Sequence, residues 1–205
     1  MLAPGIAIGI TGGIACGKSA VGGILEAAGL QVLDTDRVAH ALMVAGSGVH
    51  RQVVELFGEE ILDAGGEIDR KKLGAIVFRE PDRLAELNRI VHPAVGQAWR
   101  IWLAERVSAG EDVAVMIPLL FEVGADEGWD AILVVVAPED QVLARLAARG
   151  LSEAEARLRI ASQMPLDEKM KRTNFVIEND ESMIDLERKT LQTWQAIQRE
   201  RRVHS

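Results

Sequence analysis

The chain has 205 residues, of which 48% are apolar and 26% charged, and its formal net charge is −8. This length and balance fit one globular chain with room for an inserted subdomain, and the negative charge argues against a nucleic-acid partner. The single cysteine, Cys16, excludes an internal disulfide and a cysteine-rich metal site. No apolar run reaches the ~18 residues of a membrane span, and the start of the chain lacks the form of a signal peptide. We therefore expect a cytoplasmic protein with no membrane partner.

A phosphate-binding pattern stands near the start of the chain. The apolar run Ile6–Ile10 predicts a buried strand, GITGGIACGKSA occupies residues 9–20, and Lys18–Ala28 predicts a helix that stops at Gly29. In a G-x-x-x-x-G-K-S loop, backbone N–H groups surround phosphate oxygens, the lysine reaches the β- and γ-phosphates, and the serine hydroxyl binds Mg²⁺. The residues expected to bind nucleotide are Gly12, Gly13, Ile14, Ala15, Cys16, Gly17, Lys18, Ser19 and Ala20, with Ser19 as the metal ligand.

Cys16 inside this loop has two interpretations. The end of a helix and a neighbouring lysine charge would favour a reactive thiol. The alternative, which we favour, is that the side chain fills a position for a small residue while the backbone N–H binds the ligand.

Two carboxylates, Asp34 and Asp36, follow the second predicted strand, Gln31–Leu33. Ligands of open α/β sheets bind at the carboxyl ends of strands, so we expect both aspartates beside the phosphate loop. They would lie on the same side if the strand stays extended that far. An aspartate there can take the proton of an acceptor hydroxyl or hold metal-bound water. The alternative is a turn or a helix N-cap, where Asp is also a favoured residue.

The remaining chain alternates helices with strands. The interval 35–111 reads as helix throughout and predicts a helical insertion, because a crossover between parallel strands needs only about a dozen residues. The later runs indicate an α/β fold with a doubly wound parallel sheet of about five strands. Further strands are predicted at Val113–Ile117, Ala131–Val136 and Phe175–Ile177, and helices at Pro138–Arg149, after a capping box of Ser152 with Glu155, and at Met183–Arg202.

Four arginines follow the fourth strand. Arg145 and Arg149 are four residues apart and share a helix face, and Arg157 and Arg159 lie on the next predicted helix. Arginines that close over a triphosphate neutralise charge as the phosphoryl group moves. Gly150 interrupts the two helices and is a natural hinge, so we interpret the segment as a mobile lid. The alternative is a solvated helix face with glutamate partners.

Three classes of phosphate-loop protein compete for this pattern. A GTPase should carry N-K-x-D, and a transport ATPase should carry an L-S-G-G-Q-like signature; the sequence contains neither. A small-molecule kinase needs a carboxylate on the acceptor side and a cationic lid, and both are predicted here. The sequence favours the kinase.

The motifs taken together resemble the dephospho-coenzyme A kinase family over nearly the whole chain. The order of the D-x-D, H-P and P-L-L-F-E elements is much more specific than the phosphate loop alone. The segments that carry the resemblance are GITGGIACGKS, VLDTD, Arg70–Phe78, Leu87–Pro93, Ile117–Glu122, Gln141–Arg149, Arg159–Gln163 and Phe175–Asn179.

The resemblance implies a fold, a reaction and its cofactors. The expected fold is the three-layer phosphate-loop kinase, with a core at 1–36, 111–140 and 173–205, a helical substrate-binding insertion at 37–110 and a helical lid at 141–172. The implied reaction uses ATP and Mg²⁺ to phosphorylate the ribose 3′-hydroxyl of dephospho-coenzyme A, the last step in making coenzyme A. We expect a monomer or a small homo-oligomer.

The resemblance also suggests roles for single residues. Asp36 matches the second aspartate of the D-x-D motif and is the expected catalytic base. Lys18 and Arg149 are the other expected catalytic residues, and Arg145 and Arg149 are expected to bind ATP.

The expected substrate-binding residues are Asp34, Asp36, His92 and Glu122. The His92-Pro93 pair has the alternative role of fixing a helix start or kink. Glu122 could instead support the substrate site from behind, and Leu119, Leu120 and Phe121 are expected in the core.

Two places depart from the family pattern. Ala15 and Cys16 fill loop positions that usually hold Gly and Ser, and a methyl group at Ala15 restricts the loop if that residue needs a positive φ. Thr173-Asn174 stands where the family tends to show Ala-Asp, which puts a contact near the last strand in question.

Two alternative functions stay open, a kinase of the same fold acting on another nucleotide or small metabolite, and an ATP-binding regulatory module without turnover.

Overall fold

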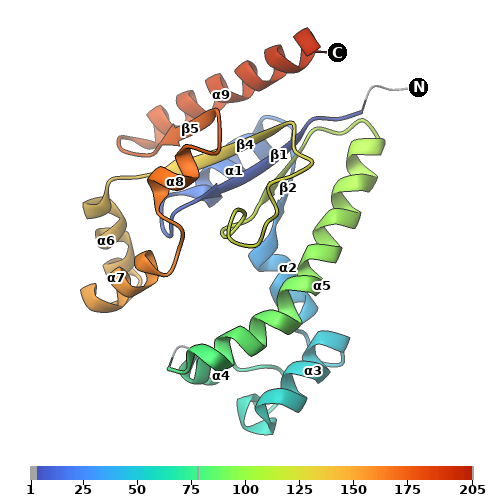
Figure 1. The fold of residues 1–205 in the computed structure, drawn as a ribbon, viewed down its shortest axis with the longest axis vertical. Helices are drawn as coiled ribbons and strands as arrows, with labels where there is room; N and C mark the ends of the chain where they lie inside the picture. The colour runs from blue at the N-terminus through green and yellow to red at the C-terminus, as the bar shows by residue number, and fades with distance from the viewer. Residues whose placement is uncertain (1–3, 78, 205) are drawn as a thin grey trace. The chain divides into compact units, whose positions relative to one another are not determined.

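The computed structural model describes residues 4–77 and 79–204, and Figure 1 shows the arrangement of its elements. Residues 1–3 and 205, at the ends of the expected core, lie outside the described residues, as does Phe78, the last residue of the motif at Arg70–Phe78. Within the described ranges, no helix combines the length and apolarity that crossing a membrane requires.

The strands form one sheet whose order is β2-β3-β1-β4-β5. Strand β1 pairs in parallel with β3 and β4, and β4 pairs in parallel with β5. All five predicted strands are present, Ala131–Val136 with the predicted bounds and the others with ends that differ by at most two residues. Their bounds are β1 Ala7–Gly12, β2 Gln31–Asp34, β3 Val113–Met116, β4 Ala131–Val136 and β5 Phe175–Glu178.

The helices expected around the sheet are also present. The capping box of Ser152 with Glu155 is confirmed at the start of α7, whereas Pro138 is the N-cap of α6 and precedes its first turn. The helices after the strands are α1 Lys18–Ala27, α6 Glu139–Ala148, α7 Glu153–Ala161, α8 Leu166–Met170 and α9 Met183–His204.

Side chains on both faces of the sheet are buried, which gives three layers. On β1, Ile8 and Ile10 pack into the core cluster that also contains Leu25 of α1 and Trp194 of α9. On the opposite face, a side chain at Gly9 would meet Leu120 and Trp129 of the 117–130 segment. Figure 1 shows α1 behind the sheet and α8 in front of it. Burial on both faces explains why the strands read as continuous apolar runs.

The chain divides into two compact units, Met1–Leu33 with Leu103–Ser205, and Asp34–Trp102. The second unit has its own core of Val53, Phe57, Ile61, Leu73, Val77 and Val91. Its helices are α2 Thr35–Leu42, α3 Gly48–Phe57, α4 Arg70–Val77 and most of α5 Pro81–Ser108, with a short 3₁₀ turn at Glu59–Ile61.

The expectation of helix throughout this interval is wrong between α3 and α4. Gly58, with φ 85°, ends α3, and Leu62 and Ile68 form an isolated antiparallel bridge. The intervening D-A-G-G segment favours a turn, because its glycines and Asp suit tight turns better than a helix.

Candidate active site

The phosphate loop connects β1 to α1, and two glycines fix its shape. Gly12 and Gly17 have φ values of 144° and 105°. A Cβ on Gly12 would lie 2.1 Å from the Val135 carbonyl oxygen, and one on Gly17 would lie 2.2 Å from Nδ2 of Asn179. Both backbone conformation and space therefore require glycine here.

Long side chains satisfy the carbonyl oxygens of the loop. Lys18 Nζ donates to the Gly13 carbonyl at 2.7 Å and to the Gly12 carbonyl at 3.2 Å. Arg145 Nη1 donates to the Ala15 carbonyl at 3.1 Å, and Asn179 Nδ2 donates to the Cys16 carbonyl at 2.8 Å. The curled backbone is thus held by Asn179, directly after β5, by Arg145 of α6 and by its own lysine.

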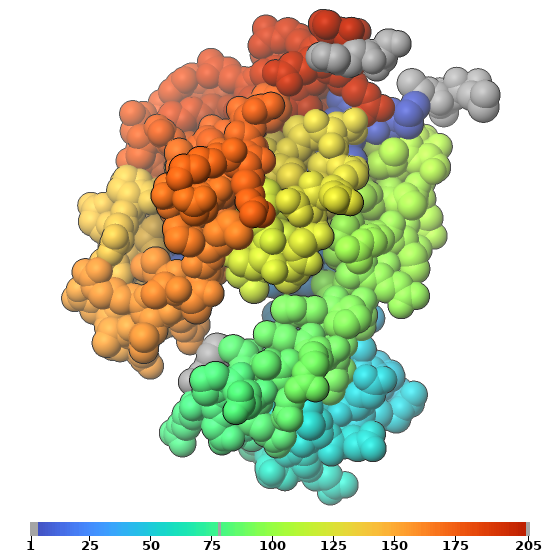
Figure 2. Space-filling model, viewed as in Figure 1, coloured from blue at the N-terminus to red at the C-terminus, as the bar shows by residue number. Residues whose placement is uncertain are grey.

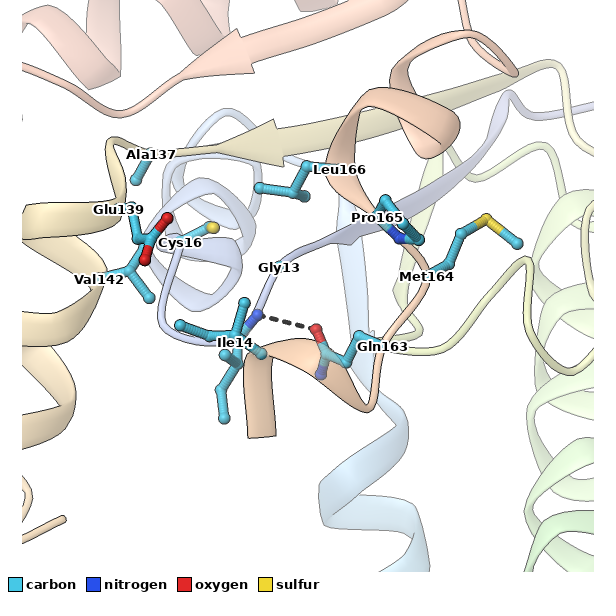
Figure 3. A pocket seen from close by; sticks show the side chains of 11 residues that line it. Gly13, Ile14, Cys16, Ala137, Glu139, Val142, Gln163, Met164, Pro165 and Leu166 are labelled. Atoms are coloured by element: carbon cyan, nitrogen blue, oxygen red, sulfur yellow. Dashed lines mark hydrogen bonds between the residues drawn. The ribbon is translucent and has the colours of Figure 1, made fainter. Parts of the chain in front are cut away.

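One N–H of the loop meets an acceptor from the lid region. Gln163 lies between α7 and α8, and its Oε1 accepts a hydrogen bond from the Ile14 N–H at 3.0 Å, drawn as a dashed line in Figure 3. A cavity of about 120 Å³ lies beside this contact. Its lining residues include Gly13 and Cys16 of the loop, Val142 of α6, Met164 before α8 and Leu166 at the start of α8.

The Cys16 thiol is buried, with 1% of the residue exposed. Burial raises the pKa of this thiol, although the Lys18 charge acts in the opposite direction. A raised pKa reduces the thiolate fraction at neutral pH, and the thiolate is the reactive form. The burial of the thiol and its raised pKa support the interpretation that the Cys16 side chain fills space and is not a reactive thiol.

Ala15 has φ 56°, which is the left-handed conformation. This is the positive φ at which a methyl group was expected to restrict the loop. This conformation costs roughly 1–2 kcal/mol for an L-residue with a Cβ. Within the described residues, Ala15 is the only non-glycine residue with a positive φ.

Asp34 is both the last residue of β2 and the N-cap of α2. Its Oδ1 accepts from the Asp36 N–H at 2.9 Å. Asp36 lies in the first turn of α2, so the strand does not stay extended as far as alternation of both side chains required, and the alternative of a helix N-cap is confirmed for Asp34. The chain turns into a helix at Thr35 because Asp34 offers the N-cap hydrogen bond. Asp36 itself is exposed.

Three of the predicted lid arginines differ in their surroundings. Arg145 is half-buried and also donates to Gln141 Oε1 at 2.9 Å. Arg149 is the exposed C-cap of α6, beside Gly150 with φ 85°, and its guanidinium makes no hydrogen bond or ion pair with residues 4–77 or 79–204. Arg157 forms ion pairs with Glu139 and Glu153 at 2.7 and 2.9 Å, which fits the alternative of a solvated face.

His92 and Pro93 lie inside α5. The interpretation of this pair as a helix start is therefore wrong, because the helix runs on both sides of it. His92 is exposed as a whole residue. Neighbouring atoms still remove part of its imidazole ring from water, and this desolvation lowers the pKa of the imidazole.

Glu122 and Ser19 are the remaining predicted site residues. Glu122 Oε1 accepts from the Met164 N–H at 2.9 Å and pairs with Lys169 Nζ at 2.8 Å. Ser19 is exposed in the first turn of α1. Leu120 and Phe121 are buried, as expected, and Leu119 is partly exposed.

Sequence reasoning assigned no role to three residues that contact this region, Gln163, Asn179 and Lys169. The first two end the segments Arg159–Gln163 and Phe175–Asn179, so their motifs were a usable signal. Lys169 lies in a segment of mixed charge, and the sequence contained no signal for its role. Thr173, at the position where the sequence departs from the family pattern, connects β4 to β5. Its hydroxyl donates to the Ile132 carbonyl and accepts from the Phe175 N–H.

Comparison with known proteins decides the family. The family model for dephospho-CoA kinase matches residues 6–185. The chain belongs to the dephospho-CoA kinase family. A dephospho-CoA kinase of Geobacillus kaustophilus is 44% identical over 199 residues, which cover 95% of this chain and 99% of that protein. The family membership makes this chain a kinase.

Solved structures agree with the fold. A Thermus thermophilus crystal structure has a TM-score of 0.76 at 39% identity and covers 94% of this chain and 97% of that one. A dephospho-CoA kinase from Campylobacter jejuni has a TM-score of 0.69 at 28% identity and covers 93% and 96% of the two chains. The expected α/β phosphate-loop kinase fold is confirmed.

Proposed function

We propose that this protein transfers the γ-phosphoryl group of ATP to the ribose 3′-hydroxyl of dephospho-CoA and releases CoA and ADP. This reaction is the final step of CoA biosynthesis. The observation that carries the proposal is the dephospho-CoA kinase family match over residues 6–185. The core supplies the nucleotide site, residues 37–110 bind the acceptor, and residues 141–172 act as the lid.

The loop residues Gly12–Ala20 would hold the phosphates of ATP. The fit is supported by the loop glycines, whose positions leave no space for a Cβ. It is also supported by the cationic side chains of Lys18 and Arg145, which donate hydrogen bonds to carbonyl oxygens of the loop. The exposed Ser19 hydroxyl is an oxygen donor of the kind that Mg²⁺ prefers. When bound, Mg²⁺ neutralises charge on the β- and γ-phosphates.

Asp36 would take the proton of the acceptor hydroxyl as the bond from the γ-phosphorus to the acceptor oxygen forms and the bond to the ADP oxygen breaks. Lys18 and Arg149 would stabilise charge on the transferring group, since phosphoryl transfer depends mainly on positioning and electrostatics. Asp34 accepts the N-cap bond from the Asp36 N–H and so would orient Asp36. It would also contact the sugar or hold metal-bound water. His92 and Glu122 would contact or support the acceptor.

We further expect a cytoplasmic enzyme that acts as a monomer or small homo-oligomer on a small-molecule acceptor, without a nucleic-acid or membrane partner.

The test is ADP formation from ATP and Mg²⁺ with dephospho-CoA, with nucleoside monophosphates, and with no acceptor. We expect turnover with dephospho-CoA, a product that co-elutes with authentic CoA, and no turnover by a Lys18→Met control. Activity with a nucleoside monophosphate alone would instead identify another metabolite kinase. Calorimetric ATP binding without turnover on any acceptor would indicate a regulatory module.

A further inference from the structure

Lys169, in the short helix α8, is a fully buried lysine, with 0% of its side chain exposed. Its Nζ lies 2.8 Å from Glu122 Oε1 and donates to the Pro118 carbonyl at 3.3 Å. The Glu122 side chain is 20% exposed and its residue lies at the surface, so the lysine end of the ion pair is fully removed from water and the carboxylate end only partly. Two residues further on, Lys171 pairs with Glu168 at 2.7 Å while 67% of its side chain stays exposed.

Burial of an ammonium group carries a desolvation penalty of several kcal/mol, and attraction to a carboxylate offsets it only with good geometry and further hydrogen bonds. A flexible lysine next to the surface ordinarily extends its charged end into water. Lys171 does so and Lys169 does not. The interior position of Lys169 therefore calls for a reason beyond general stability.

Two short routes lead from the Lys169 ammonium group to the phosphate loop. On the first, the Pro118 carbonyl that accepts from Lys169 also accepts from Thr11 Oγ1 at 3.1 Å, and Thr11 immediately precedes Gly12. On the second, the carboxylate oxygen of Glu122 that meets Lys169 also accepts from the Met164 N–H at 2.9 Å.

The second route ends on the loop itself. Met164 follows Gln163, whose Oε1 accepts from the Ile14 N–H at 3.0 Å, as Figure 3 shows. In Figure 2 the surface of the yellow 117–130 segment adjoins the orange segment that contains α8. Lys169, itself within the proposed lid at 141–172, thus joins the segment after β3, the connector between α7 and α8, and the start of the phosphate loop.

We propose that Lys169 is a positioning residue for phosphoryl transfer. Through Glu122 it fixes the connector at 163–165 against the phosphate loop, and through the Pro118 carbonyl it fixes the end of β1. Lys169 touches neither substrate in this role. The inference rests on the proposed kinase function, because a fixed lid end matters only where a lid must place charges on a moving phosphoryl group.

The test compares Lys169→Met with Lys171→Met, a matched control that removes an exposed lysine from the same segment. We expect kcat to fall about 10- to 100-fold in Lys169→Met, because small misplacements of catalytic groups cost rates of this order. The KM for ATP should change less than about threefold, since most ground-state binding contacts remain. Lys171→Met should keep wild-type kcat and KM.

Two further measurements separate positioning from folding. Rates are taken well below the Tm of each variant, with folding checked by circular dichroism. Amide hydrogen exchange should speed up by at least about tenfold at Ile14 in Lys169→Met and stay unchanged in Lys171→Met, because a weakened contact opens more often. A double-mutant cycle combines Lys169→Met with Glu122→Gln. We expect the loss in log kcat of the double variant to be smaller than the sum of the losses in the two single variants.

A lower Tm with normal kcat and normal exchange at Ile14 would make Lys169 merely structural and overturn the proposal. Additive losses in the cycle would overturn the route through Glu122. If Lys169→Met does not fold, the double variant, which buries no unpaired charge, decides by the same readouts. The exchange measurement needs no acceptor, so it tests the linkage even if dephospho-CoA proves not to be the substrate.

Discussion

The side-chain oxygen of Gln163 accepts a hydrogen bond from the backbone N–H of Ile14 at 3.0 Å, across 149 positions of sequence. Ile14 belongs to the loop proposed to bind the phosphates of ATP. An N–H group has one hydrogen to donate, so a phosphate oxygen that takes this hydrogen must displace the Gln163 side chain, while the bond from the Met164 N–H to Glu122 can stay in place. The contact therefore links nucleotide binding to the connector between α7 and α8 of the proposed lid.

We predict that Gln163→Ala tightens ATP binding about fivefold, because it removes a competing hydrogen bond worth about 1 kcal/mol. Isothermal titration calorimetry measures the change. Gln52→Ala, at an exposed glutamine of α3, is the control and should leave affinity unaltered. Weaker binding in Gln163→Ala would mean that Gln163 holds the nucleotide and does not compete with it.

For Asp36→Asn we predict that turnover falls by about 10²- to 10⁴-fold, the usual contribution of a positioned acid or base, while the affinity for ATP stays within about threefold. Steady-state kinetics and calorimetry measure the two quantities. Asp82→Asn is the matched control, because Asp82 is also exposed in the first turn of a helix. Turnover near the wild-type value in Asp36→Asn would rule out Asp36 as the base.

Removal of the exposed Arg149 guanidinium tests the lid. Arg149→Ala should lower turnover by roughly 30- to 1000-fold, equivalent to about 2–4 kcal/mol, and weaken ATP binding less. Arg157→Ala should have near-normal turnover, since Glu139 and Glu153 already engage that side chain on the surface. Hydrogen exchange over residues 141–163 should slow when ATP and acceptor bind. Unchanged exchange, together with normal turnover in Arg149→Ala, would contradict a lid.

The positive φ of Ala15 predicts that Ala15→Gly stabilises the fold by about 0.5–1 kcal/mol. Relief of roughly 1–2 kcal/mol of backbone strain exceeds the extra flexibility that glycine gives the unfolded chain. Ala144→Gly, in ordinary helical conformation within α6, should instead destabilise by about 0.5–1 kcal/mol. Urea unfolding of both variants measures the difference, and equal destabilisation by the two would show that Ala15 is unstrained.

The strands and the phosphate loop could be predicted from the sequence because local pattern determines them. Continuous β-branched runs such as Ala131–Val136 are stable only as strands buried on both faces, and the spacing of Gly12, Gly17 and Lys18 matches a conformation that few other residues allow. The capping box at Ser152 is equally local. Local rules failed at Asp34, where strand and N-cap were both compatible with the sequence and the N-cap bond ended the strand.

Tertiary structure alone decided which charged side chains reach the phosphate loop. Arg145 bonds the Ala15 carbonyl across 130 positions, while Arg157, on a similar helix, pairs with glutamates in solvent. Lys169 and Lys171 are two residues apart in one charged segment, yet the first is fully buried and the second exposed. A charge becomes buried where the packed chain supplies it with partners, and those partners, such as Glu122 for Lys169, lie far away in the sequence.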